Sequence, residues 1–317
     1  MQKKQMKFAD DGWAVWIDGD DTSTVYINDW INPQGKNYVD LAIRIRGIKT
    51  GKYLSVYVPF SVSREEIEDV SLLFKDTKIL QATFSAGCIV DYKKNEHTSE
   101  VAYNGKTIDI VHISTLEFQT KSISKGTLIG IDLSYLQPYL DNDESYFIWR
   151  MPHKTLDEIF KHYVNVGKIL KRLRDLITSP VMSEKYGYSI RINESRLLPE
   201  EITRIGAFHR QKLIKAVITL SINEEYEIND SGCYRIRRLE ENLYKEYLPL
   251  DYQYENVITY QWNQNREYNL QGQFNFYYSI ARNSISRGSM LLYMMILLGI
   301  SVVSNIIATN VNLLLGL

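Results

Sequence analysis

An uncharged segment, Gly288 to Leu317, closes the printed sequence and constrains the chain more than any other feature. At about 1.5 Å of rise per residue, a helix over this segment exceeds the roughly 20 residues that cross the hydrocarbon core of a bilayer. The charged residues just before it, Arg282 and Arg287, are basic, and the positive-inside rule assigns them to the cytoplasmic side. We therefore expect a tail-anchored, single-pass protein of the cell inner membrane, with a cytoplasmic N-terminal domain.

The predicted membrane helix carries a stripe of small and polar residues. At 100° per residue they fall in one sector, opposite an arc of Val, Ile and Leu; they are Ser301, Asn305, Ala308, Thr309 and Asn312. Only Asn310 breaks the pattern. Because unsatisfied amides are costly in lipid, the stripe favours a homo-oligomer that turns it inward. It then serves as a packing seam or as the lining of a pore; alternatively, the chain leaves the bilayer after Ile307.

Alternating apolar and polar residues indicate strands through most of the first 150 residues. The alternation is regular in residues 39–46 and 53–60, and the turn between them favours a hairpin. Ser63 and Glu66 form a capping box that predicts one helix among the strands. Further strand candidates are residues 13–17, 24–27, 79–84, 108–113, 127–133 and 145–150.

After Pro152 the hydrophobic period changes to that of helices. Thr155 and Glu158 form a second capping box, which predicts a helix to about residue 178, and Pro199 opens another that reaches about residue 215. A short helix over residues 237–247 follows, and the last strand candidates are residues 217–222, 256–262 and 273–280. The expected fold class is α+β, with a β-rich, sandwich-like domain (1–152), a mixed helical and strand domain with a basic helical segment (153–284), and a C-terminal transmembrane helix (285–317).

No pattern of catalytic or metal-ligating residues stands out. Asp18, Asp20 and Asp21 offer oxygen ligands for Mg²⁺, but such a loop is also an ordinary connection between antiparallel strands, and its spacing is not that of an EF-hand. The letters GKT at Gly105 lack the upstream glycine of a phosphate-binding loop and suit a hairpin turn. His112 suits a hydrogen-bonded position in a core or at a sheet edge. We predict a protein that is not an enzyme and has no metal or cofactor.

Positive charge concentrates in the middle of the chain. Residues 161–238 hold 15 Lys and Arg against 9 Asp and Glu, although the whole protein has a net charge of −1. These cations suit a phosphate-binding surface, with tyrosines to stack on bases; solvated faces and docking on anionic lipid are the other interpretations. The candidate residues for binding a nucleotide or nucleic acid are Lys168, Lys171, Arg172, Arg174, Arg204, Arg210, Lys212 and Lys215.

A large β-rich body followed by one polar-striped helix resembles membrane effectors of bacterial anti-phage defence systems, among them the Hailong-type channel effector. The resemblance is one of architecture, carried by residues 289–317 and the basic helices, without a diagnostic motif. It implies a tetrameric membrane pore that is held shut by a DNA oligomer made by a partner nucleotidyltransferase. No site residues carry over from the family.

Three classes of function remain. In the first, a homo-oligomeric effector senses a nucleotide or oligonucleotide with its cytoplasmic domain and gates a pore. In the second, a membrane-tethered scaffold has no pore, and the polar stripe is only a seam between helices. In the third, a membrane-tethered enzyme has a site that the sequence does not reveal. The expected partners are other copies of the chain, the lipid bilayer, and a nucleotide signal with the enzyme that makes it.

Overall fold

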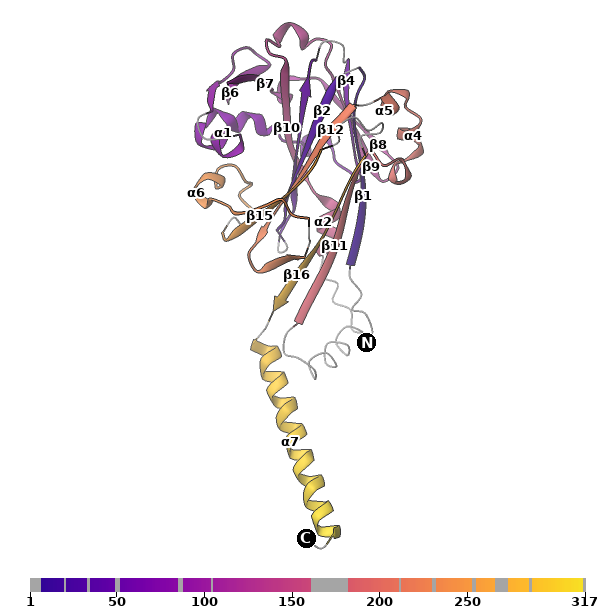
Figure 1. Ribbon diagram of the computed structural model, residues 1–317, viewed down its shortest axis with the longest axis vertical. Coiled ribbons are helices and arrows are strands. Elements are labelled where there is room, and N and C mark those ends of the chain that lie inside the picture. Colours follow the sequence, from indigo (N-terminus) through magenta and orange to yellow (C-terminus); the bar gives the residue numbers. More distant parts are fainter. Residues whose placement is uncertain are drawn as a thin grey trace.

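Two β-sheets pack face to face, and one long helix projects from an end of this sandwich (Figure 1). The structure is a computed structural model. It describes residues 7–19, 21–32, 35–48, 52–84, 88–103, 105–160, 182–210, 212–229, 232–252, 255–265, 273–284 and 287–315.

One sheet has seven strands and the other has nine. The order across the seven-stranded sheet is β13 (Tyr226–Asn229), β16 (Phe274–Ser284), β11 (Met182–Ile192), β1 (Lys7–Ile17), β4 (Tyr53–Val58), β9 (Gly126–Asp132) and β8 (Phe118–Ile123). The order across the nine-stranded sheet is β14 (Arg235–Arg238), β15 (Val257–Asn265), β12 (Lys212–Asn223), β2 (Thr22–Trp30), β3 (Tyr38–Arg46), β10 (Glu144–Pro152), β7 (Lys106–Val111), β6 (Thr98–Tyr103) and β5 (Ile89–Asp91). The expected β-rich, sandwich-like α+β fold is confirmed.

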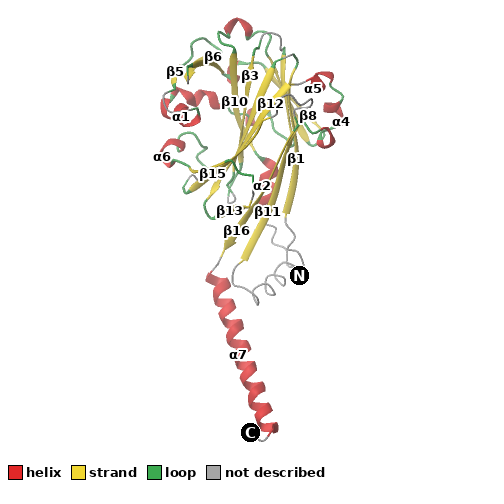
Figure 2. Cartoon of the chain, in the orientation of Figure 1, coloured by secondary structure: helices red, strands yellow, loops and turns green. Residues whose placement is uncertain are grey.

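The shorter helices of the described residues flank the sheets (Figure 2). The helices α1 (Thr77–Thr83) and α6 (Glu241–Tyr244) pack over the outer face of the nine-stranded sheet. On the opposite side, α4 (Glu200–Thr203) and α5 (Gly206–Arg210) pack on the seven-stranded sheet. Helix α2 (Lys154–Phe160) follows β10, and short 3-10 helices span Arg64–Glu66, Val70–Lys75, Ile113–Thr115, Gln137–Tyr139 and Ser195–Leu197.

A single hydrophobic interior joins the two sheets. Val25 and Leu41 of the nine-stranded sheet belong to the same buried cluster as Val15 and Val56 of the seven-stranded sheet. Strands from the two halves of the chain also meet within each sheet, because β1 pairs in parallel with β11 and β2 pairs in parallel with β12. The boundary expected at residue 152 therefore separates strands that share both sheets and one core.

The hairpin predicted from residues 39–46 and 53–60 is wrong, although both segments are strands. Strand β3 pairs with β2 and β10 in the nine-stranded sheet, whereas β4 pairs with β1 and β9 in the other sheet. The connection begins at Gly47, whose φ of +79° suits glycine, and it crosses between the layers. The loop at Asp18 likewise connects two sheets, because β1 and β2 lie in different layers.

The strand predicted at residues 79–84 is also wrong, because this segment is helix α1. Asp76 caps the helix by accepting a hydrogen bond from the Lys78 amide at 2.7 Å. Ile79 and Leu80 are buried and pack in the cluster beneath the helix. A short apolar run fits either kind of element, and here the cap and the tertiary packing favour the helix.

The helix predicted from Pro199 to about residue 215 ends at Arg210. Lys212 and Lys215 lie instead on strand β12, which pairs with β2 and β15. The short helix predicted at residues 237–247 begins too early, because Arg235–Arg238 is strand β14 and only Glu241–Tyr244 is helical. Most of the predicted helix from Thr155 to residue 178 lies outside the described residues.

Two local predictions are confirmed. Strands β6 and β7 form an antiparallel hairpin whose turn includes Gly105, with a φ of +70°. His112 is fully buried, and its ring nitrogens lie 2.8 Å from the hydroxyls of Ser71 and Ser99. The histidine is thus a hydrogen-bonded core residue.

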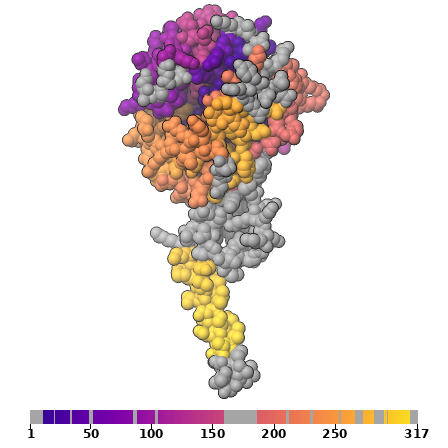
Figure 3. Space-filling view, viewed as in Figure 1, coloured from indigo at the N-terminus to yellow at the C-terminus, as the bar shows by residue number. Residues whose placement is uncertain are grey.

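The long helix α7 (Arg287–Leu315) follows β16 and extends away from the sandwich (Figures 1 and 3). The window Tyr293–Asn310 is long and apolar enough to cross a membrane, and none of it is buried within the chain. This helix is compatible with a single-pass membrane anchor.

Candidate functional site

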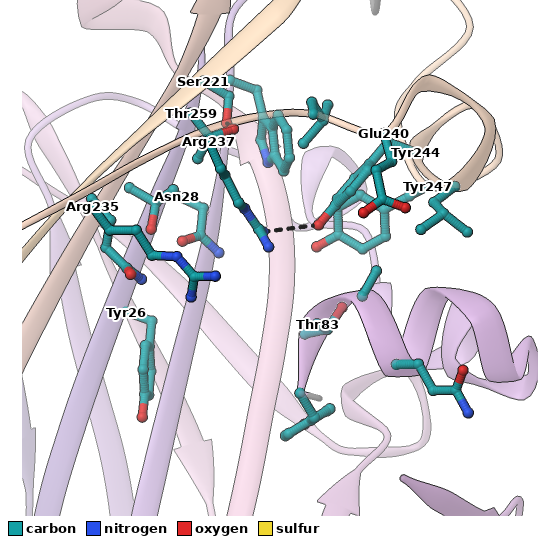
Figure 4. Close-up of a pocket in the computed structure, with 18 of the residues that line it drawn as sticks. Tyr26, Asn28, Thr83, Ser221, Arg235, Arg237, Glu240, Tyr244, Tyr247 and Thr259 are labelled. Atoms are coloured by element: carbon teal, nitrogen blue, oxygen red, sulfur yellow. Dashed lines mark hydrogen bonds between the residues drawn. The ribbon is translucent and has the colours of Figure 1, made fainter. Parts of the chain in front are cut away.

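A pocket of about 740 Å³ opens on the outer face of the nine-stranded sheet, and we call it the outer-sheet pocket (Figure 4). Side chains of β2, β12, β15 and β14 form its floor. Residues of α1 and α6 rise around it, including Thr83 and Tyr244. The pocket therefore lies where two short helices leave part of the sheet uncovered.

The floor of the pocket follows from the register of the strands. The first row of cross-strand neighbours is Arg235, Gln261, Thr219 and Asn28, and the second is Arg237, Thr259, Ser221 and Trp30. Alternate residues of each strand face the same side, so both rows point outward, and neighbouring residues of β2 and β12, such as Ile27 and Leu220, are buried in the core. The hydroxyl oxygens of Ser221 and Thr259 lie 3.0 Å apart. The floor thus offers hydrogen-bonding groups from four adjacent strands.

Positive charge dominates the lining of the pocket. Arg235 and Arg237 project from β14, and Lys78 contributes from α1, whereas Glu240 is the one carboxylate among the described lining residues. The guanidinium of Arg237 donates to the Tyr244 hydroxyl at 3.1 Å (Figure 4). No ion pair involves Arg235 or Arg237 among the described residues, so their charge is available to an anion.

Aromatic rings form the wall beside these arginines. The ring centroid of Trp30 lies 5.9 Å from that of Tyr244 and 5.8 Å from that of Tyr247. Tyr26 and Tyr146 pair across the floor with centroids 6.3 Å apart. Trp30, Tyr244 and Tyr247 are buried, with 5%, 8% and 4% of their surface exposed, so these rings give the pocket a small apolar surface.

A buried ion pair holds the aromatic wall in place. The carboxylate of Asp40 accepts hydrogen bonds from Arg150 at 2.6 Å, from the Trp30 indole at 2.6 Å and from the Tyr247 hydroxyl at 2.7 Å. Arg150 also donates to the main-chain oxygen of Tyr247 at 2.6 Å. Burial together with the Asp40 charge raises the pKa of the Tyr247 hydroxyl well above its usual value, so that it remains a donor. The rings are therefore fixed before any ligand arrives.

A second polar group lies buried between the two sheets, and we call it the inter-sheet cluster. Tyr278 donates to Asp29 at 3.0 Å, and Tyr188 donates to Asp11 at 2.7 Å. The His153 Nε2 atom lies 2.9 Å from the Tyr188 hydroxyl and 3.5 Å from Asp29 Oδ1. Burial raises the pKa of Asp29 to about 8 and lowers the pKa of His153 to about 3. Their neutral forms are favoured near pH 7.

The structure separates the basic residues that the sequence grouped together. Arg204 pairs with Glu200 on the side of the seven-stranded sheet, and Arg210 ends α5 on that same side. Lys215 lies on the nine-stranded sheet, in the cross-strand row of Thr24. Lys168, Lys171, Arg172 and Arg174 lie outside the described residues. Arg204 therefore does not reach the outer-sheet pocket, and α5 packs on the other sheet.

The candidate ligand residues omitted Arg235 and Arg237, although both belong to the basic middle of the chain. They alternate with Tyr234 and Ile236, and this period of two is typical of a strand with one cationic face. The expected helix at residues 237–247 concealed the alternation. The alternating pattern is visible in the sequence, but it covers only four residues.

The polar residues of α7 are partly satisfied within the helix. The Thr309 hydroxyl donates to the Asn305 main-chain oxygen at 2.9 Å, and the Asn310 amide donates to that of Ile306 at 2.9 Å. Ser301, Asn305 and Ala308 lie exposed along the single helix, and Asn312 lies in its last turn. Asn310, which breaks the stripe, thus has a partner of its own.

No group of three or more His, Cys, Asp or Glu residues able to hold a metal occurs among the described residues. In comparisons with known proteins, no family model and no curated protein matches the chain. A solved structure, the Fcho1 Mu homology domain from Danio rerio with bound Eps15 peptide, aligns with 89% of this chain and 82% of its own at 9% identity. At a TM-score of 0.09, this alignment supports no inference about fold or function.

Proposed function

We propose that the chain is a single-pass membrane protein whose β-sandwich binds a phosphate-bearing ligand with a planar ring, such as a nucleotide, in the outer-sheet pocket. The observation that carries this proposal is that Arg235 and Arg237 line the same pocket as an aromatic cluster, and that Arg237 donates to the hydroxyl of Tyr244, whose ring centroid lies 5.9 Å from that of Trp30. The arginines bind the phosphates through charge-assisted hydrogen bonds, and the aromatic wall receives the ring. The polar floor then discriminates among ligands that share these two groups.

The proposal also assigns a function to helix α7, which responds to ligand binding in the sandwich. Helix α7 associates with its copies through the stripe of Ser301, Asn305, Ala308, Thr309 and Asn312, and the assembly encloses a polar pathway. Arg282 and Arg287 keep the sandwich on the cytoplasmic side of the inner membrane. Ligand in the pocket controls the pathway through the strands that connect the sandwich to α7.

A second candidate is a membrane-tethered scaffold whose helices associate without a pathway. The hydrogen bonds of Thr309 and Asn310 to their own helix favour it, because these polar groups then need no water. In this case the stripe is a packing seam of small residues. The pocket then holds a partner at the membrane and does not control a pore.

Isothermal titration calorimetry of the full-length protein in detergent tests the ligand class, with ATP, adenosine and inorganic triphosphate as probes. We expect ATP to bind more tightly than either fragment, because only ATP uses both the arginines and the aromatic wall. Replacing Arg235 and Arg237 by Ser weakens ATP binding about a hundredfold. The matched control replaces two exposed lysines at the edge of the other sheet, Lys121 of β8 and Lys125 of the turn after it, by Ser and leaves binding unchanged.

Three results would contradict the proposal. ATP binding that survives the loss of both arginines would assign the anion site elsewhere. Triphosphate that binds as tightly as ATP would remove the role of the aromatic wall. An absence of binding by all three probes would exclude the ligand class.

A further inference from the structure

Strand β14 is an edge of the nine-stranded sheet, and its single partner in the described sheet is β15. All four of its residues are exposed. An exposed edge presents main-chain donors and acceptors to any extended segment that meets it. What approaches this edge depends on its backbone direction and on its side chains.

The hydrogen-bond register shows which main-chain groups face outward. The Leu239 amide donates to the Val257 oxygen at 2.8 Å. This pair lies two residues further along the same ladder as the pair Arg237 and Thr259. In an antiparallel ladder, alternate residues bond the same neighbour. Arg235 and Arg237 therefore bond β15, and the amide and carbonyl groups of Ile236 and Arg238 point away from it.

The side chains of this edge combine exposed apolar surface with positive charge. Tyr234 is 75% exposed and Ile236 is 62% exposed, although both are large hydrophobic residues. Arg235, Arg237 and Arg238 take part in no ion pair among the described residues. An added strand would thus find apolar contacts next to guanidinium groups that lack a carboxylate.

The arginines exclude symmetric pairing with a second copy. Two copies can pair in antiparallel fashion only when the outward residues of both, such as Ile236 and Arg238, bond each other. Every two-fold register of this kind centred in β14 sets at least one arginine opposite an arginine, at a separation of about 5 Å. Like charges directly opposite destabilise a sheet, so the edge rejects its own copy and favours an acidic strand.

We propose that β14 binds an extended acidic segment of a partner protein by strand addition to the nine-stranded sheet. The main chain of Ile236 and Arg238 supplies the ladder hydrogen bonds, and the arginines select carboxylates at alternate positions. This interaction does not rest on a ligand in the outer-sheet pocket. Arg235 and Arg237 also line that pocket, whereas Ile236 and Arg238 are outside its lining, so a change at Arg238 tests the edge separately.

Fluorescence anisotropy of a labelled seven-residue peptide that alternates Glu and Val tests the proposal, with full-length protein in nanodiscs of neutral phosphatidylcholine. The first control peptide alternates Lys and Val. The second keeps the Glu and Val sequence but carries N-methyl groups on alternate amides, which removes the donors of one edge. We expect the unmodified acidic peptide to bind and each control to bind about tenfold more weakly or not at all.

Two protein variants locate the binding. Arg238→Glu reverses a charge at the outward edge and weakens the acidic peptide about tenfold. Lys121→Glu makes the same reversal on β8, an edge of the other sheet, and leaves binding unchanged. Three results would overturn the proposal. The N-methylated peptide could bind as tightly as the unmodified acidic peptide, or the two protein variants could lose the same affinity for the acidic peptide. The third is that the acidic peptide does not bind at millimolar concentration.

Discussion

At the scale of single residues, two buried carboxylates, Asp40 and Asp29, differ in the hydrogen-bond donors that surround them. Asp40 has a full set of donors, including Arg150 and the Trp30 indole, and holds the pocket wall. Among the described residues, Asp29 has one donor, Tyr278, and its Oδ1 atom has no hydrogen-bond partner. Burial without a cation is costly for a charged carboxylate, so Asp29 favours its protonated form.

This difference predicts a pH-dependent effect of Asp29→Asn. The pKa of Asp29 is raised from 3.8 to about 8 in the folded protein, mainly by burial. Between these values the folded state keeps a proton that the unfolded chain releases, so the free energy of unfolding of the natural protein decreases as pH rises. The asparagine side chain of the variant cannot ionise. We expect the variant to gain stability relative to the natural protein from about pH 4 to about pH 8, by at most about 1.4 kcal/mol per pH unit.

Urea denaturation across this pH range measures the effect. Tyr278→Phe is the companion variant, because the Tyr278 hydrogen bond lowers the pKa of Asp29 and its loss extends the window to higher pH. The Asp91→Asn variant, at an exposed position on β5, is the control for the loss of a carboxylate. A stability difference between Asp29→Asn and the natural protein that stays constant with pH would contradict this account.

At the scale of elements, sequence periodicity identified strands better than their neighbours. The alternation in β3 and β4 revealed that each has one buried face, but it carried no information on which strand lies beside it. Strand β3 lies in the nine-stranded sheet and β4 in the seven-stranded sheet. Short elements were harder still, because the four residues of β14 and the seven of α1 fit both periods. The pocket depends on both elements, so it could not be assembled from the sequence.

Helix α1 supports a second prediction at this scale. Its start depends on the Asp76 cap, so Asp76→Ala should lower the free energy of unfolding by about 1 kcal/mol. Lys75→Ala, at an exposed neighbouring position, should change it by less than about 0.5 kcal/mol. Urea denaturation of both variants checks the difference. Equal stabilities would show that the cap does not determine this helix.

At the scale of the whole molecule, the proposal assigns ligand binding to the sandwich and the membrane pathway to helix α7. The outer-sheet pocket and the cationic edge β14 face away from the core, while β16 leads from the seven-stranded sheet toward α7 (Figure 1). The inter-sheet cluster lies between these parts, because Asp29 is on β2 and Tyr278 is on β16. The cluster thus joins the sheet that holds the pocket to the strand that precedes helix α7.

The most direct test is single-channel current across a planar bilayer that contains the full-length protein with verified orientation, recorded with and without ATP. The account predicts discrete conductance steps whose open probability changes with ATP. It predicts no such change in the Arg235→Ser/Arg237→Ser variant, and loss of the steps when Asn305, Thr309 and Asn312 are replaced by Leu. A bilayer that stays silent under both conditions, with protein that still binds ATP, would contradict the account and leave α7 as an anchor and packing seam.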